Sequence, residues 1–232
     1  MPTAAKILDS NAATNLNPAR LIRVAAAPIV LTSIAVIASL FPGVCDLLQF
    51  DRAAIARGEV WRVVTGNFVH WNADHLIWDS LMFFILGLAI ELRSRHRHLE
   101  SDSAIGNLFV LTTVASAIAV SACVWFFTPL ERYRGLSGID SALFVLLAAW
   151  YLVDVIKSGA YSQAAIPSGL LLCFLAKIGY EIATGHTYFV DSTAAAFVPL
   201  PQVHLAGAGI GVLFFALVNR TSAVLHTAVH LI

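Results

Sequence analysis

Charge is scarce in this chain. Only 12% of its 232 residues are Asp, Glu, Lys or Arg, and 59% are hydrophobic. Soluble domains usually carry about 25% charged residues. The formal net charge is zero, so no attraction to nucleic acid is expected. Little charge, together with long uncharged runs, predicts an integral membrane protein in contact with the lipid bilayer.

Cysteines are also few, and a secretory signal pattern is lacking. Cys45, Cys123 and Cys173 are too scattered for a disulfide framework. We interpret Cys123 and Cys173, which lie in apolar runs, as packing residues. The first apolar run is too long for a signal peptide and has no small-residue cleavage site. The polar residues 1–20 before it are expected to form a disordered cytoplasmic tail.

Six apolar segments approach the length of about 20 residues that a membrane-spanning helix needs. They cover roughly residues 24–41, 75–92, 105–128, 138–156, 164–183 and 203–219. The sequence therefore predicts an all-α polytopic protein, with one six-span bundle over residues 21–220 and a short cytoplasmic tail over 221–232. Between the first two spans, residues 42–74 mix apolar and charged side chains, which is typical of amphipathic pieces in the membrane interface.

Lysine and arginine set the predicted orientation. With the N-terminus inside, eight basic residues fall on the inner side and five on the outer side. The bias is strongest in the cluster from Arg93 to His98. Because cytoplasmic loops carry an excess of Lys and Arg, both termini are expected to face the cytoplasm.

Polar residues recur at the start of alternate spans. Spans two, four and six must all begin on one face of the membrane, whichever face that is. Their first residues include His75 and Asp79, then Ser137, then His204. Ionisable groups within a span are costly and are functional candidates by default. The topology therefore predicts one polar site near one membrane surface.

Ser137 lies between Gly135 and Gly138 at the start of the fourth span. The free N–H groups of a first helical turn form an anion site, which suits the oxyanion of a tetrahedral intermediate. The two glycines allow a tight turn and close approach of a substrate backbone. The alternative interpretation of Ser137 is an ordinary helix N-cap.

A face almost free of side chains follows His204. Its members, at i, i+3, i+4 and i+7, are His204, Gly207, Ala208 and Gly211. Small residues after Ser137 offer a partner face: Gly138, Ser141 and Ala142. If the two faces pack, Ser137 meets His204, which would take its proton as a general base. The alternative is an interfacial His above an ordinary packing motif.

His75 and Asp79 are spaced i, i+4 and share a helix face. His75 would donate to an oxyanion, and Asp79 would orient a histidine or donate when protonated. Alternatively, the two form a hydrogen-bonded pair that fixes helix packing. His70 either supports the site or faces lipid headgroups. Lys177 and Glu181 are interpreted as a neutralising structural pair. Asp140, one turn after Ser137, could tune the site, bind a substrate amine or cap the helix, and none of these roles is preferred.

In these residues the chain resembles the rhomboid intramembrane serine proteases over nearly its whole length. The matching motifs, in family order, are Trp61-Arg62, His70-(x)4-His75-Leu76, Gly135-Leu136-Ser137-Gly138 and His204-x-x-Gly207-x-x-x-Gly211. The resemblance implies a Ser137–His204 dyad without a third acid or a cofactor. It also implies that His75 lines the oxyanion hole beside the Ser137 N–H, and that Trp61-Arg62 shapes an interface-embedded loop.

One position departs from the usual rhomboid pattern. Asp79 stands where that pattern has Asn, and an ionised Asp cannot donate to an oxyanion. With the short chain, this variation is most similar to the rhombosortase branch, a bacterial group associated with processing of C-terminal tail anchors that contain Gly-Gly. The resemblance thus implies single-span or tail-anchored substrates and a bacterial inner membrane location.

Two other kinds of protein remain open from the sequence. One is a catalytically inactive rhomboid-like protein that binds transmembrane clients. The other is a membrane hydrolase with zinc held by His75, Asp79 and His204, whose metal-bound water would be the nucleophile.

Overall fold

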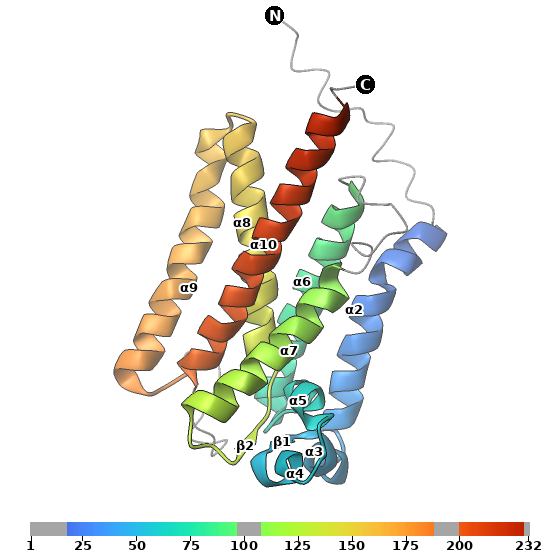
Figure 1. Cartoon of the computed structure of the whole chain (residues 1–232), viewed down its shortest axis with the longest axis vertical. Helices are drawn as coiled ribbons and strands as arrows, with labels where there is room; N and C mark the ends of the chain where they lie inside the picture. Colours follow the sequence, from blue (N-terminus) through green and yellow to red (C-terminus); the bar gives the residue numbers. More distant parts are fainter. Residues whose placement is uncertain (1–17, 97–107, 188–199, 230–232) are drawn as a thin grey trace, which may run out of the picture.

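The computed structural model describes residues 18–96, 108–187 and 200–229. Within these ranges six helices are long and apolar enough to cross a membrane, so the predicted six-span, all-α architecture is confirmed (Figure 1). They are α2 (Pro18–Ser39), α6 (Ala73–His96), α7 (Leu108–Phe127), α8 (Ser137–Lys157), α9 (Ala165–Thr184), which follows the short η4 (Tyr161–Ala164), and α10 (Pro201–Val229). Residues 1–17 of the predicted tail lie outside the described residues, and α10 runs on into the stretch predicted as the second tail.

Apolar side chains face both inward and outward on these helices. On α6, for example, Phe83 and Ile90 are fully buried, whereas Ile77 and Ile85 are exposed. This is expected where the surroundings are lipid, because an apolar side chain is then accepted on either face. Cys123 is buried, but Cys173 is exposed on α9, so the packing interpretation is wrong for Cys173.

Helices α8 and α10 pack at backbone contact. A Cβ atom added at Gly207 would collide with the carbonyl oxygen of Gly138, and one added at Gly211 would collide with that of Ala142. A Cβ at Gly138 would in turn lie 3.0 Å from the carbonyl oxygen of Val203. Only glycine permits this approach, which brings the first turns of the two helices together.

Short elements cover the end of the bundle at which α6, α8 and α10 begin, which we call the site end (Figure 1). They are α3 (Pro42–Leu48), β1 (Phe50–Asp51), α4 (Arg52–Ala56), α5 (Arg62–Thr65), η2 (Gly66–Phe68) and β2 (Arg132–Tyr133). Strands β1 and β2 pair antiparallel, with Phe50 opposite Tyr133. The short helices fit the amphipathic pieces expected between spans one and two. The strand pair was not foreseen, since its partners are far apart in the sequence.

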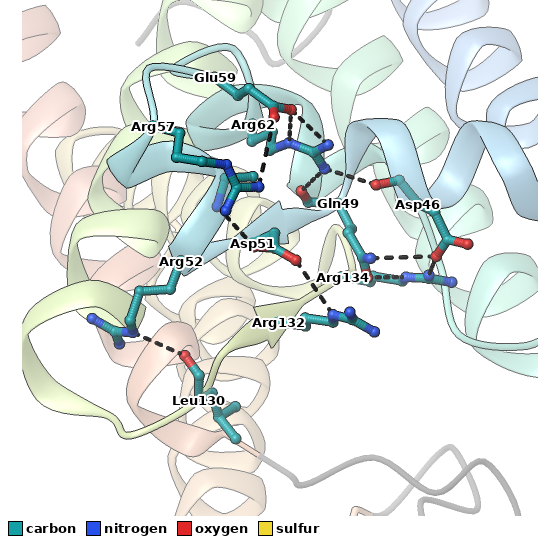
Figure 2. A network of polar contacts seen from close by, with 11 residues as sticks. Asp46, Gln49, Asp51, Arg52, Arg57, Glu59, Arg62, Leu130, Arg132 and Arg134 are labelled. Carbon is teal, nitrogen blue, oxygen red and sulfur yellow. Dashed lines mark hydrogen bonds and ion pairs between the residues drawn. The ribbon is translucent and has the colours of Figure 1, made fainter.

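Arginine side chains hold this cap together (Figure 2). Arg62 is buried and donates to the carbonyl oxygens of Asp46 at 2.7 Å and Gln49 at 3.0 Å, while pairing with Glu59 at 2.8 Å. Arg134, next to β2, pairs with Asp46 at 2.8 Å. These contacts tie the segment before α6 to the segment before α8. The cap thereby fixes the turn from which Ser137 emerges.

Candidate active site

The structure brings together the polar residues that begin alternate spans. Ser137 is the first residue of α8, and His75 and His204 lie in the first turns of α6 and α10. All three helices start at the site end (Figure 1). The side-chain oxygen of Asn72 accepts a hydrogen bond from the His75 N–H at 2.8 Å, and so caps α6.

The turn before Ser137 is built around Gly135. Its φ is +130°, and a Cβ atom there would lie 2.7 Å from Cε1 of His75. The Tyr133 hydroxyl donates to the Gly135 carbonyl oxygen at 3.1 Å and also interacts with the Ser137 side chain. Burial raises the pKa of Tyr133 far above its usual value, so the phenol stays a neutral donor. Ser137 itself is half-buried.

Asp79 connects α6 to this turn. Its Oδ2 atom accepts from the Leu136 N–H at 2.9 Å and lies 3.1 Å from His75 Nε2 and 3.3 Å from His70 Nε2. Helix α8 has no side-chain cap of its own, so the carboxylate from α6 satisfies the N–H just ahead of it. Asp79 thus contacts His75 and His70 as well as the turn before Ser137.

His70 is buried beside Asp79 and does not face headgroups. Its Nδ1 atom lies 3.1 Å from the Ser39 hydroxyl at the end of α2. Burial lowers the pKa of His70, more than Asp79 opposes this, so the neutral ring is favoured. A neutral ring has one N–H and one acceptor nitrogen, which suits a residue held between a hydroxyl and a carboxylate.

The hydroxyl in hydrogen-bond contact with His204 belongs to Ser141. Its Oγ lies 3.2 Å from His204 Nδ1, and it donates to the Ser137 carbonyl oxygen at 2.8 Å. Because a hydroxyl has one hydrogen, its oxygen is left to accept from an Nδ1–H. That tautomer leaves Nε2 as the basic nitrogen of the ring. The ring also interacts with the backbone of Ser137.

Two ionisable side chains from α9 reach the other ring nitrogen. Lys177 Nζ lies 3.3 Å and Glu181 Oε2 lies 3.4 Å from His204 Nε2. Lys177 and Glu181 pair with each other at 2.7 Å, as the i, i+4 spacing suggested. Their contact with His204 was not foreseen. The available signal was two ionisable residues within one span.

Asp140 lies one turn into α8 and is buried, with an Oδ1 atom that has no hydrogen-bond partner among the described residues. Over the same part of the chain, no group of three or more His, Cys, Asp or Glu residues is arranged to hold a metal ion. Asp79 Oδ2 is directed at two imidazoles and a backbone N–H, so this oxygen is already surrounded by donors.

The fold and the buried polar cluster define a multi-pass integral membrane protein with a candidate hydrolytic site at one end of its bundle. Residues 57–221 match the Rhomboid domain model, and the chain belongs to the rhomboid family. It is 23% identical to human Rhomboid-related protein 3 over 168 residues, which are 71% of this chain and 38% of that protein. Rhomboids are in general serine proteases that act on membrane proteins within the bilayer, and some members are inactive.

Proposed function

We propose that this protein is an active intramembrane serine endopeptidase with Ser137 as nucleophile and His204 as base. One observation carries the proposal: the close contact of Gly138 and Gly207 holds the first turns of α8 and α10 together, and the Ser141 hydroxyl joins the His204 ring to the Ser137 carbonyl oxygen. The Ser141 contact favours the tautomer in which Nε2 carries no hydrogen and is the basic nitrogen of the ring. A nucleophile, a base and a helix N-terminus then share one location at the site end.

In the proposed reaction, Ser137 Oγ attacks a substrate carbonyl carbon while its proton passes to His204 Nε2. The oxyanion forms at the N-terminus of α8, where the Ser137 N–H has no acceptor within the helix. Collapse breaks the C–N bond, and Nε2–H protonates the leaving amine. Water then attacks the acyl-enzyme, gives its proton to Nε2, and releases the acid as the serine hydroxyl is restored.

His75 is the proposed side-chain component of the oxyanion hole. Its ring lies against Gly135, two residues before Ser137 in the chain. Asp79 is the proposed orienting group, because its Oδ2 atom contacts both the ring and the Leu136 N–H. In this role Asp79 holds the donors in place and does not itself donate a hydrogen bond to the oxyanion. An Asp at the position where the usual rhomboid pattern has Asn is therefore compatible with the proposed mechanism.

The proposed substrate is a single-span protein or a C-terminal tail anchor, cut near the outer surface by an enzyme with both termini in the cytoplasm. Small residues at the cut site fit best, since a membrane helix must unwind there and glycine favours unwinding. The resemblance to rhombosortases supports Gly-Gly anchors of sorted surface or secreted proteins, and a bacterial inner membrane. Gly-Gly and Leu-Leu versions of one model anchor, compared for cleavage, test this preference directly.

A fluorophosphonate probe tests the mechanism, because it reacts much faster with an activated serine than with an ordinary hydroxyl. We expect the wild type to be labelled at Ser137, Ser137→Ala to be unlabelled, and His204→Ala to be labelled far more slowly. Ser162→Ala removes a hydroxyl from the exposed η4 turn and is the matched control.

Two other outcomes would contradict the proposal. A folded wild type that resists the probe but retains transmembrane clients would indicate an inactive binder. Cleavage that survives Ser137→Ala and stops with a chelator would indicate metal chemistry.

A further inference from the structure

Helix α9 buries an acid where a membrane helix would normally bury an apolar residue. Of its 20 residues, the buried ones are Pro167, Ile178 and Glu181. Most of its other side chains face outward, and α9 has the smallest buried share of the six spans. A carboxylate inside a span is costly unless it has partners. The partners of Glu181 are therefore informative, and they are Lys177 and His204.

The two oxygens of Glu181 have different surroundings. Oε1 is 2.7 Å from Lys177 Nζ, whereas Oε2 is buried without a hydrogen-bond partner among the described residues. Oε2 lies 3.4 Å from His204 Nε2. While Nε2 is unprotonated it has no hydrogen to offer, and Lys177 faces it at 3.3 Å instead. Once Nε2 carries a proton, the vacant acceptor is next to it.

Other groups around His204 do not offer this acceptor. On α8, Ser141 faces Nδ1 and the backbone of Ser137 lies against the ring. From α6, the Oδ2 atom of Asp79 faces His70, His75 and the Leu136 N–H. Glu181 Oε2 thus lies beside Nε2, which is the nitrogen that must become protonated.

We propose that Glu181 is a positioning residue that stabilises the protonated form of His204, and that Lys177 holds its carboxylate in place. The inference rests on the proposed function, because it concerns the step in which Ser137 loses its proton. The Oγ–H bond breaks, the Nε2–H bond forms, and this new N–H is shared between Oε2 and the nitrogen of the leaving amine, while Lys177 stays on Oε1. The proton then leaves with the amine, and Lys177 faces the neutral ring again.

The rate of fluorophosphonate labelling in detergent, measured beside the unfolding temperature, tests this role. Glu181→Gln keeps the shape and removes the charge. We expect it to slow labelling by about 10- to 100-fold, the size of a hydrogen bond to a charged group. Glu181→Asp, which restores a carboxylate, should recover part of the rate. Glu131→Gln makes the same change at an exposed site beside β2 and should label like the wild type.

A charge exchange separates positioning from structure. The double variant Lys177→Glu, Glu181→Lys keeps an i, i+4 ion pair in α9 but puts the ammonium where the carboxylate was. We expect an unfolding temperature near that of the wild type, with labelling as slow as in Glu181→Gln. Labelling at the wild-type rate in Glu181→Gln or in the exchange would overturn the inference. A slow exchange variant that also unfolds well below the wild type would overturn it too, by indicating a packing role.

Failure of the underlying mechanism gives a different result. In that case the wild type is not labelled, or Ser137→Ala is labelled as fast as the wild type, whatever occupies position 181. Both results would remove the basis of the inference. Rapid Ser137-dependent labelling with no effect at position 181 would remove the inference alone.

Discussion

Gly207→Ala is the sharpest test of how helix packing makes the site. The added methyl would lie well inside the van der Waals contact distance of the Gly138 carbonyl oxygen, and 3.4 Å from the Ala142 amide nitrogen. Neither neighbour can give way alone, since both are backbone atoms of α8. The two helices must therefore move apart at the turn that follows His204.

Two effects of different size follow. Overpacking of this kind usually costs about 1–3 kcal/mol of stability, partly offset by the 0.5–1 kcal/mol that Ala gains over Gly in a helix. The catalytic effect is larger, because a misplacement of about 1 Å between reacting groups can cost roughly 100-fold in rate. We expect fluorophosphonate labelling of Ser137 to fall by about 100-fold or more while the protein still folds.

Gly209→Ala is the matched control on the same helix. A Cβ atom there meets nothing within 4 Å, so only helix propensity changes. This variant should label like the wild type and be slightly more stable. The reasoning would be refuted if Gly207→Ala also labelled at the wild-type rate, since the close contact of α8 and α10 would then not control the site.

Three further predictions concern the surroundings of the site. Gly135→Ala should lower the unfolding temperature and abolish labelling, because φ is +130° and the new methyl would lie 2.7 Å from the His75 ring; normal labelling would contradict this. Arg62→Met should cost about 1–3 kcal/mol by leaving buried carbonyl oxygens of the cap without donors. Chemical unfolding measures this loss, and an unchanged midpoint would show that the cap does not depend on Arg62. Stability should also fall as pH drops below about 6.5, where unfolded His70 takes up a proton that its buried folded form resists. Unfolding temperatures from pH 7.5 to 5 check this, and His70→Gln should flatten the curve; an equal slope in that variant would assign the effect to other groups.

Apolar composition and length were enough to predict the six spans, since each helix satisfies its own backbone groups and needs only an apolar segment of the right length. The shared depth of His75, Ser137 and His204 followed from counting spans. The pairing of β1 with β2 could not be predicted, because two-residue strands carry almost no pattern of their own. Their pairing depends on where the cap places them.

The sequence by itself determined which groups are present and at which end of the bundle they lie, because helix direction alternates from span to span. Only the tertiary structure decided which group meets which. Asp79 contacts His75 and His70. Ser141 contacts Nδ1 of His204, and the Lys177–Glu181 pair of α9 contacts its Nε2. Such contacts depend on the rotation and separation of whole helices. Those are set by backbone contacts such as Gly138 with Gly207, which no local pattern specifies.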